Sequence, residues 1–280
     1  YTAMAKITAA EVNKLRKQTG AGMMDCKKAL VEAEGDFDKA IEILRKKGQK
    51  VAEKRSDRDA NEGVVIAATT EDQKYAAMIM LNCETDFVAK NEDFVGVAKS
   101  ILNIALNEKP GSVEDLKALK FDANQSVAEK ITEEVGKIGE KIDLGEIATV
   151  SSDKVIAYNH PGYKTAAIVA MSKDADGVEE AGKNVAMQIA AMNPVALNED
   201  SVSDEIKARE LEIGKEQALK EGKPENIVDK IAQGKLQKYY KENTLLNQQY
   251  FVDNKKSVAE YLKSVDKELT VSDFKRSSLV

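Results

Sequence analysis

Residues 8–48, TAAEVNKLRKQTGAGMMDCKKALVEAEGDFDKAIEILRKKG, contain the clearest start and stop signals for helices in the chain. Thr8 and Glu11 have the spacing of a capping box, in which the two side chains bind free backbone amides at the start of a helix. Gly20 and Gly35 follow the first and second apolar stretches, and glycine at such a position can end a helix in a left-handed conformation. The pattern therefore predicts three short helices in succession.

The third predicted helix starts after Asp36 and is expected to end at Gly48. Its apolar side chains recur at the spacing of one helix face, namely at Phe37, Ala40, Ile41 and Leu44. Because so short a stretch has few apolar side chains, it can form only a small core, which favours a docking module over a catalytic one. Met4-Ala5-Lys6 is typical of a natural start, so we treat Tyr1–Ala3 as an added segment and place the module at residues 4–48.

Two successions of strand, strand and helix are predicted beyond this module. Residues 49–62 are rich in charged side chains of both signs, which is typical of a linker, either helical or irregular. Strand patterns at Gly63–Thr70 and Tyr75–Leu81 then precede an amphipathic helix around Phe94. The second succession lies at Lys154–Tyr158, Lys164–Ser172 and Val178–Met192. Because the spacing between strands and helix is comparable in the two successions, we predict a duplicated core in an α+β fold.

A helical insertion divides the second half of this core. Two helical patterns within residues 201–240 are joined by Gly222-Lys223-Pro224, which predicts an antiparallel hairpin that forms a coiled coil. Each arm would be about 30 Å long and is expected to project into solvent. The apolar positions suffice for one seam, formed by Ile206, Leu211, Leu219, Ile227, Ile231 and Leu236. The core subdomains are then residues 63–150, and residues 151–200 with 241–280.

The composition argues against several classes of partner. The 280 residues include 42 Lys and Arg against 48 Asp and Glu, a formal charge of -6, and no Trp. Such a chain offers neither an extended positive field nor many stacking platforms, so nucleic acid is not an expected partner. No stretch approaches the roughly 18 apolar residues of a membrane span, so no membrane is expected. Cys26 and Cys83 have neither disulfide nor zinc spacing, which favours the reducing cytoplasm.

The motifs that suggest chemistry are weak. Residues 177–183 have the glycine and lysine spacing of a phosphate-binding loop, but Asn184 stands where Ser or Thr would hold magnesium. Glu179 and Glu180 within this stretch would also repel phosphate. The single histidine, His160, has no Ser or Cys that the sequence could pair with it. We therefore expect no enzyme activity, cofactor, metal or small-molecule substrate.

The stretch NCETDFVAK, residues 82–90, joins a predicted strand to a predicted helix. Such a connection can present side chains rigidly to a partner. Phe87 is then either a core residue or an exposed wedge, and composition alone favours the core, because aromatic residues next to a strand usually face inward. Met23 and Met24 are likewise open between ordinary packing and an adaptable apolar contact surface.

At these two places the chain resembles the elongation factor Ts family, the exchange factors for elongation factor Tu in bacterial translation. The resemblance rests on Arg16 with residues 19–30, TGAGMMDCKKAL, and on Asn82-Cys83 with residues 85–89, TDFVA. Both stretches are long and specific, and the resemblance extends over essentially the whole chain. It implies an α+β fold with an N-terminal three-helix (UBA-like) module, a duplicated core and an inserted helical hairpin.

The resemblance also implies which residues meet the partner. Carried over by position, it makes Thr85, Asp86, Phe87 and Val88 the segment that enters the nucleotide domain of the GTPase and disturbs its magnesium and phosphate sites. Phe87 would be the wedge. The N-terminal module would dock on a helix of the same domain through four residues, Arg16, Met23, Met24 and Lys27.

Weaker contacts are implied in the second core subdomain. His160 matches a family histidine that meets another domain of the partner, but residues 161–164 depart from the family pattern, so an ordinary turn histidine stays an open alternative. Phe251 and Val252 follow the hairpin in a segment that resembles the family more loosely.

The function implied is guanine nucleotide exchange: the chain would bind elongation factor Tu carrying GDP and promote GDP release during translation elongation. The alternative is a scaffold that binds a GTPase without exchange activity. A hydrolase based on a surface carboxylate pair is less favoured, because acid pairs on helix faces are typical of solvated surface.

Overall fold

The first helix begins and ends at the residues that carry the predicted caps, whereas the second ends at Glu32, with Ala33 rather than Gly35 as its C-cap. In a computed structural model that describes residues 6–280, α1 is Ala9–Thr19 and α2 is Met23–Glu32. Thr8 and Glu11 form the capping box, and Gly20 ends α1 with a φ of 69°. The buried residues of this module are Val12, Leu15, Cys26, Ala29, Leu30, Ala33 and Ala40. The expectation about Tyr1–Ala3 lies outside the described residues.

The third helix does not end at Gly48, so that prediction is wrong. α3 is Phe37–Arg55 and continues through half of the stretch predicted as a linker. Gly48 is buried against α7, Val127–Ile138, and a Cβ added at Gly136 would lie 2.7 Å from the Cα of Gly48. Glycine is therefore present here because the two helix backbones approach closely.

The chain divides into two compact units, which we describe separately. One contains the residues up to Ile66 together with Ile79–Ile147, and the other contains Ala67–Met78 and Ala148–Ser278. Three strands contribute residues to both units: β1 (Glu62–Thr69), β2 (Tyr75–Cys83) and β3 (Asp143–Ser151). They form a sheet in the order β1-β2-β3.

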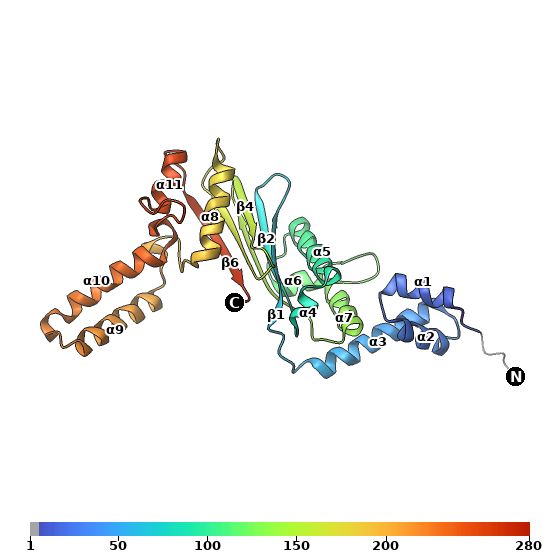
Figure 1. Cartoon of the computed structure of the whole chain (residues 1–280). Coiled ribbons are helices and arrows are strands. Elements are labelled where there is room, and N and C mark those ends of the chain that lie inside the picture. Colours follow the sequence, from blue (N-terminus) through green and yellow to red (C-terminus); the bar gives the residue numbers. More distant parts are fainter. Residues whose placement is uncertain (1–5) are drawn as a thin grey trace. The chain divides into compact units, whose positions relative to one another are not determined.

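Four helices complete the first unit. α4 (Asp86–Ala89) and α5 (Glu92–Glu108) follow β2, and α6 (Val113–Ala118) precedes α7 (Figure 1). The predicted helix around Phe94 is confirmed as α5. Ser126 and Glu129 form a capping box at the start of α7. β3 was not predicted, because its sequence DLGEIATVS includes glycine and charged residues and its burial does not alternate.

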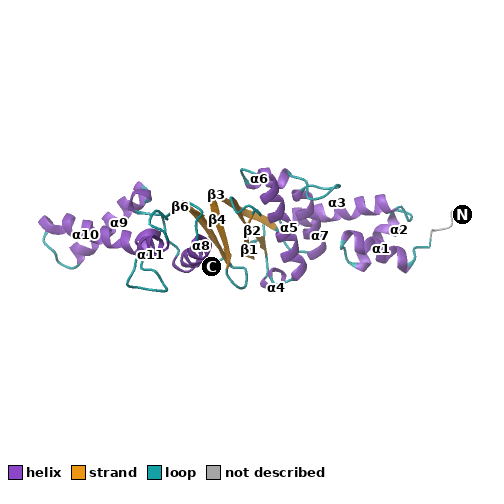
Figure 2. Cartoon of the chain, turned by 90° about the horizontal axis from the view of Figure 1, so that it is seen from above, coloured by secondary structure: helices purple, strands orange, loops and turns teal. Residues whose placement is uncertain are grey.

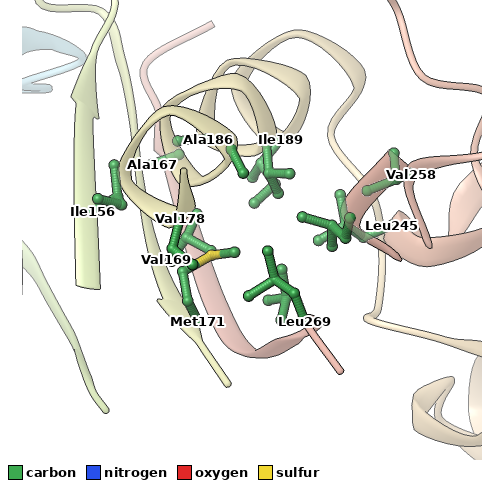
Figure 3. Packing of buried hydrophobic residues seen from close by; sticks show 14 of the residues in the cluster. Ile156, Ala167, Val169, Met171, Val178, Ala186, Ile189, Leu245, Val258 and Leu269 are labelled. Atoms are coloured by element: carbon green, nitrogen blue, oxygen red, sulfur yellow. The ribbon is translucent and has the colours of Figure 1, made fainter. Parts of the chain in front are cut away.

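The second unit is built on a sheet in the order β4-β5-β6. The strands are β4 (Lys154–Asn159), β5 (Thr165–Met171) and β6 (Val271–Ser278), and both pairs are antiparallel. Helix α8 (Val178–Met192) packs on β4 and β5 (Figure 2). Side chains from the sheet, α8 and α11 (Val258–Val265) enclose one apolar core (Figure 3). The tail after the hairpin thus completes this core, as predicted.

The helical hairpin is present, although part of its predicted seam is wrong. α9 (Asp204–Lys220) and α10 (Glu225–Asn243) pack against each other (Figure 1). Leu219 and Ile227 are exposed rather than in the seam. Small residues are used instead, since a Cβ added at Gly214 would lie 3.1 Å from the Cα of Ala232. Two short 3-10 turns, Glu199–Ser201 and Leu245–Asn247, flank the hairpin.

Candidate functional site

The connection from β2 to α5, residues 84–91, contains the single helical turn α4. We call these residues the β2–α5 loop. Thr85 caps α4, because its hydroxyl accepts a hydrogen bond from the Val88 amide at 3.4 Å. Asn91 then caps α5 by accepting hydrogen bonds from the amides of Asp93 and Phe94. Two caps within seven residues leave the loop little conformational freedom.

Phe87 points outward from this loop, with 83% of its surface exposed. The interpretation from composition alone, that Phe87 is a core residue, is therefore wrong. The physical reason is that α4 has only one turn, whose inward position is occupied by the buried Ala89. Phe94 on α5, only 1% exposed, supplies the aromatic side chain to the core instead.

Glu140 anchors the start of the loop. Its carboxylate accepts hydrogen bonds from the amides of Glu84 and Thr85 at 2.9 and 3.0 Å, and from the Thr85 hydroxyl at 2.6 Å. No sequence pattern indicated this role, because Glu140 follows α7 and is 55 residues from Thr85 in the chain.

The Glu84 side chain makes a second attachment, to α3. Both of its oxygens accept a hydrogen bond from the Arg55 guanidinium at 3.0 Å, and one also accepts the Lys141 amide at 2.7 Å. The Lys141 amide and the Arg55 charge hold the pKa of Glu84 below its usual range. The carboxylate is therefore charged at neutral pH, and the loop is connected to the helix that carries the N-terminal module.

The remaining loop residues are partly exposed around Phe87. Thr85, Asp86 and Val88 are half-buried. Asp86 accepts a hydrogen bond from the Lys90 ammonium at 3.2 Å, which lowers the pKa of Asp86. The loop thus surrounds an exposed aromatic ring with a hydroxyl, an acid and an aliphatic side chain, a surface suited to contact with another protein.

The four candidate residues of the N-terminal module are all exposed. Met23 and Met24 lie in the first turn of α2, 51% and 62% exposed, so the packing alternative for them is wrong. Lys27 is on the following turn, and Arg16 is at the end of α1. Cys26 faces the opposite way: burial raises the pKa of its thiol, and the nearby Arg16 lowers that pKa by less.

The three weaker candidates lie in the second unit. His160 is exposed at the turn between β4 and β5, where Tyr158 and His160 share a hydrogen bond of 2.9 Å between Oη and Nδ1. Phe251 and Val252 are exposed in the segment before α11. The side chain of the buried Gln188 of α8 accepts a hydrogen bond from the Phe251 amide at 2.9 Å, which attaches this segment to α8. His160 is thus part of the turn and is also accessible at the surface.

The other sequence features form no site. Gly177 is the N-cap of α8 and Gly182 is buried against Ile156, so the stretch that resembles a phosphate loop is part of a packed helix. Across residues 6–280, no three His, Cys, Asp or Glu side chains are grouped so as to hold a metal ion. Nor is any helix in this described range both long and apolar enough to cross a bilayer. Cys26 and Cys83 are both buried, and neither is in a disulfide.

Comparison with known proteins identifies the family. The family model described as Elongation factor TS matches residues 84–279. The chain belongs to the elongation factor Ts family. It is 58% identical to elongation factor Ts of Christiangramia forsetii, over 99% of this chain and all of that protein. The elongation factors Ts of Flavobacterium psychrophilum and Porphyromonas gingivalis are 52% and 49% identical, over at least 98% of both chains in each case. Membership of the elongation factor Ts family makes this chain an elongation factor of protein biosynthesis.

Proposed function

We propose that this chain is a guanine nucleotide exchange factor that binds elongation factor Tu carrying GDP and promotes GDP release. The observation that carries the proposal is the exposure of Phe87 on a doubly capped loop. Aromatic side chains are enriched at protein–protein interfaces, so an exposed Phe on a loop with fixed ends supports a contact with a partner. In this proposal the ring enters the nucleotide domain and disturbs the magnesium and phosphate sites of the partner.

Exchange of this kind needs no catalytic group, so we propose that the chain is not an enzyme. It must only bind the nucleotide-free partner more tightly than the loaded one. Linkage then requires that nucleotide weakens the binding of the factor by the same ratio, so GTP can later release the factor. The cycle turns without covalent chemistry and without a cofactor on this chain.

The size of the effect can be estimated from the buried side chain. Burial of a Phe side chain stabilises a complex by about 1.5–3 kcal/mol, and each 1.4 kcal/mol corresponds to roughly tenfold in an equilibrium constant. Burial of Phe87 alone therefore accounts for a change of about ten- to a hundredfold in the equilibrium constant. A larger acceleration must also use the N-terminal module, through Arg16, Met23, Met24 and Lys27, and the second unit, through His160, Phe251 and Val252.

Three finer features belong to the same proposal. The three N-terminal helices would form a UBA-like module, and the two successions β1-β2-α5 and β4-β5-α8 would be copies of one duplicated subdomain. The cytoplasm would be the site of action, which the buried Cys26 and Cys83, neither of them in a disulfide, support. Elongation factor Tu would be the partner, with no direct contact to nucleic acid.

The proposal is tested by timing the release of a fluorescent GDP from elongation factor Tu in a stopped-flow instrument. The wild-type chain should accelerate release. Phe87→Ala should reduce this acceleration by about ten- to a hundredfold, because the variant loses the burial of one Phe side chain. The matched control is Ile213→Ala, which removes an exposed apolar side chain from the hairpin and should leave the rate unchanged.

The result also separates exchange from the scaffold alternative. A scaffold would bind elongation factor Tu in a pull-down or titration but leave GDP release at its spontaneous rate. Equal rates with wild type and Phe87→Ala would contradict the role of the wedge, even if exchange occurs.

A further inference from the structure

The carboxylate of Glu140 is engaged entirely by the β2–α5 loop. Oε2 accepts two consecutive amides, those of Glu84 and Thr85, and Oε1 accepts the Thr85 hydroxyl. Three charge-assisted hydrogen bonds on one carboxylate form a strong and directional contact. The contact joins the end of α7 to the residues immediately before Phe87.

This contact determines how α4 begins. The Thr85 hydroxyl donates to Glu140 and accepts from the Val88 amide, so one rotamer of Thr85 satisfies both bonds. With Thr85 fixed as the N-cap, the α4 turn has Ala89 buried and Phe87 in solvent. The direction of the Phe87 ring is thus set through Thr85 by a residue that is remote in sequence.

Glu140 is itself held in place by its neighbour. The Lys141 ammonium donates to the backbone carbonyls of Ser56 and Arg58 just after α3, at 3.0 and 3.1 Å. The Lys141 amide donates to the Glu84 carboxylate. The turn that carries Glu140 is therefore attached both to the end of α3 and to the loop, so its position does not depend on the presence of a partner.

We propose that Glu140 is a positioning residue, which holds the β2–α5 loop in the conformation that presents Phe87 before the partner arrives. A loop that is already ordered loses less conformational entropy on binding, which leaves more of the binding energy to distort the nucleotide site. The inference rests on the proposed function, since it concerns how the same Phe87 ring is delivered. Glu140 need not touch elongation factor Tu for this role.

The kinetic test measures GDP release over a range of factor concentrations. Glu140→Ala removes all three hydrogen bonds, so the maximal rate at saturation should fall by about tenfold or more, while the half-saturating concentration changes by less than about twofold. A purely structural defect would instead lower the amount of folded factor, so it would raise the half-saturating concentration and leave the maximal rate unchanged. Glu108→Ala, an exposed acid at the end of α5, is the matched control and should behave as wild type.

Rescue by a conservative variant sharpens this test. Glu140→Gln retains an oxygen for the two loop amides and presents an amide that can donate to the Thr85 hydroxyl, so it should keep most of the maximal rate. Glu140→Asp keeps the charge but is one methylene shorter and cannot reach all three donors. It should lower the maximal rate, and it replaces Glu140→Ala if that variant does not fold.

A second measurement needs no partner. Amide hydrogen exchange at Glu84 and Thr85 in the free chain should be faster in Glu140→Ala than in wild type or Glu108→Ala. An unchanged maximal rate or unchanged exchange in folded Glu140→Ala, or in Glu140→Asp where it replaces that variant, would overturn the inference, while Phe87→Ala still reports on the proposed function. If the wild-type chain does not accelerate GDP release, the proposed function fails, and hydrogen exchange alone decides whether Glu140 orders the loop.

Discussion

Phe87 and Phe94 show how two similar residues on consecutive helices reach opposite environments. Phe94 lies on α5, which is long enough to bury a continuous face, whereas Phe87 lies on the single turn α4, where Ala89 takes the inward position. The difference comes from caps and hydrogen bonds around the rings rather than from the rings themselves. At the scale of the residue, the polar groups of Thr85, Glu84 and Glu140 therefore hold the loop that exposes Phe87.

The Glu84 carboxylate leads to a prediction about pH. Its pKa is lower in the folded chain than the usual value of about 4.3, chiefly because it accepts the Lys141 amide and also pairs with Arg55. Its contribution to stability is thus fully present above the unfolded pKa and is lost as the pH falls through the lower folded pKa. The difference in the free energy of unfolding between wild type and Glu84→Gln should be largest at neutral pH and shrink below about pH 4.

Urea unfolding followed by circular dichroism at several pH values measures this difference. Glu71→Gln, a charge removed from an exposed turn, is the matched control and should change the free energy of unfolding by less than about 0.5 kcal/mol at neutral pH. A difference for Glu84→Gln that stays constant from pH 7 to pH 3 would show that the charge of Glu84 contributes nothing.

At the scale of the secondary-structure element, the main feature is the close approach of two helices. α3 and α7 cross at Gly48 and Gly136, where a Cβ at Gly48 would lie 3.0 Å from the Thr132 carbonyl oxygen. This crossing explains why α3 continues past a glycine that would otherwise end a helix. It also places the end of α3 within reach of Glu84, through Arg55.

Two alanine substitutions test the crossing, because alanine at a helical glycine has opposite effects in open and in crowded positions. Gly96→Ala on α5 has no atom within 4 Å of the new Cβ and should raise the free energy of unfolding by about 0.5–1 kcal/mol. Gly136→Ala would place its Cβ against the Gly48 backbone, which cannot move aside, and should lower stability by about 1–2 kcal/mol. Urea unfolding of both variants checks this, and equal stabilities would refute the crossing as the reason for Gly136.

At the scale of the whole molecule, the candidate contacts are distributed over both compact units. Phe87 and the N-terminal residues belong to one, while His160, Phe251 and Val252 belong to the other. In two of these segments a polar side chain binds the backbone: Glu140 accepts an amide of the β2–α5 loop, and Gln188 accepts the amide of Phe251. This arrangement suits a factor that binds its partner at several separate places.

Separate contacts should make independent contributions to exchange. We expect the losses in GDP release rate caused by Phe87→Ala and Phe251→Ala to multiply in the double variant, because contributions of sites that do not interact are additive in free energy. Stopped-flow release below saturation, with wild type and the two single variants in parallel, measures this. A double variant no slower than the slower single variant would mean that the two rings act on one common step.

Much of the layout follows from local sequence. Thr8, Asp36 and Ser126 cap helices, and Gly20 ends one. In the second unit, the bounds of β4, β5 and α8 were predicted to within a residue or two. The resemblance supplied the exposed role of Phe87, which composition alone had assigned to the core. The end of α3, the strand β3 and the seam of the hairpin were predicted wrongly or not at all.

The sequence by itself determined the elements that depend on neighbours a few residues apart, since caps, helix faces and turns are local. Only the tertiary structure decided that Gly48 lies inside a helix crossing, that Phe87 faces water and that Glu140 holds the loop. These depend on atoms brought together from distant parts of the chain, such as Thr85 with Glu140 and Gly48 with Gly136. The periodicity of a sequence does not predict such long-range contacts, because the backbone path between the two residues is determined only when the core packs.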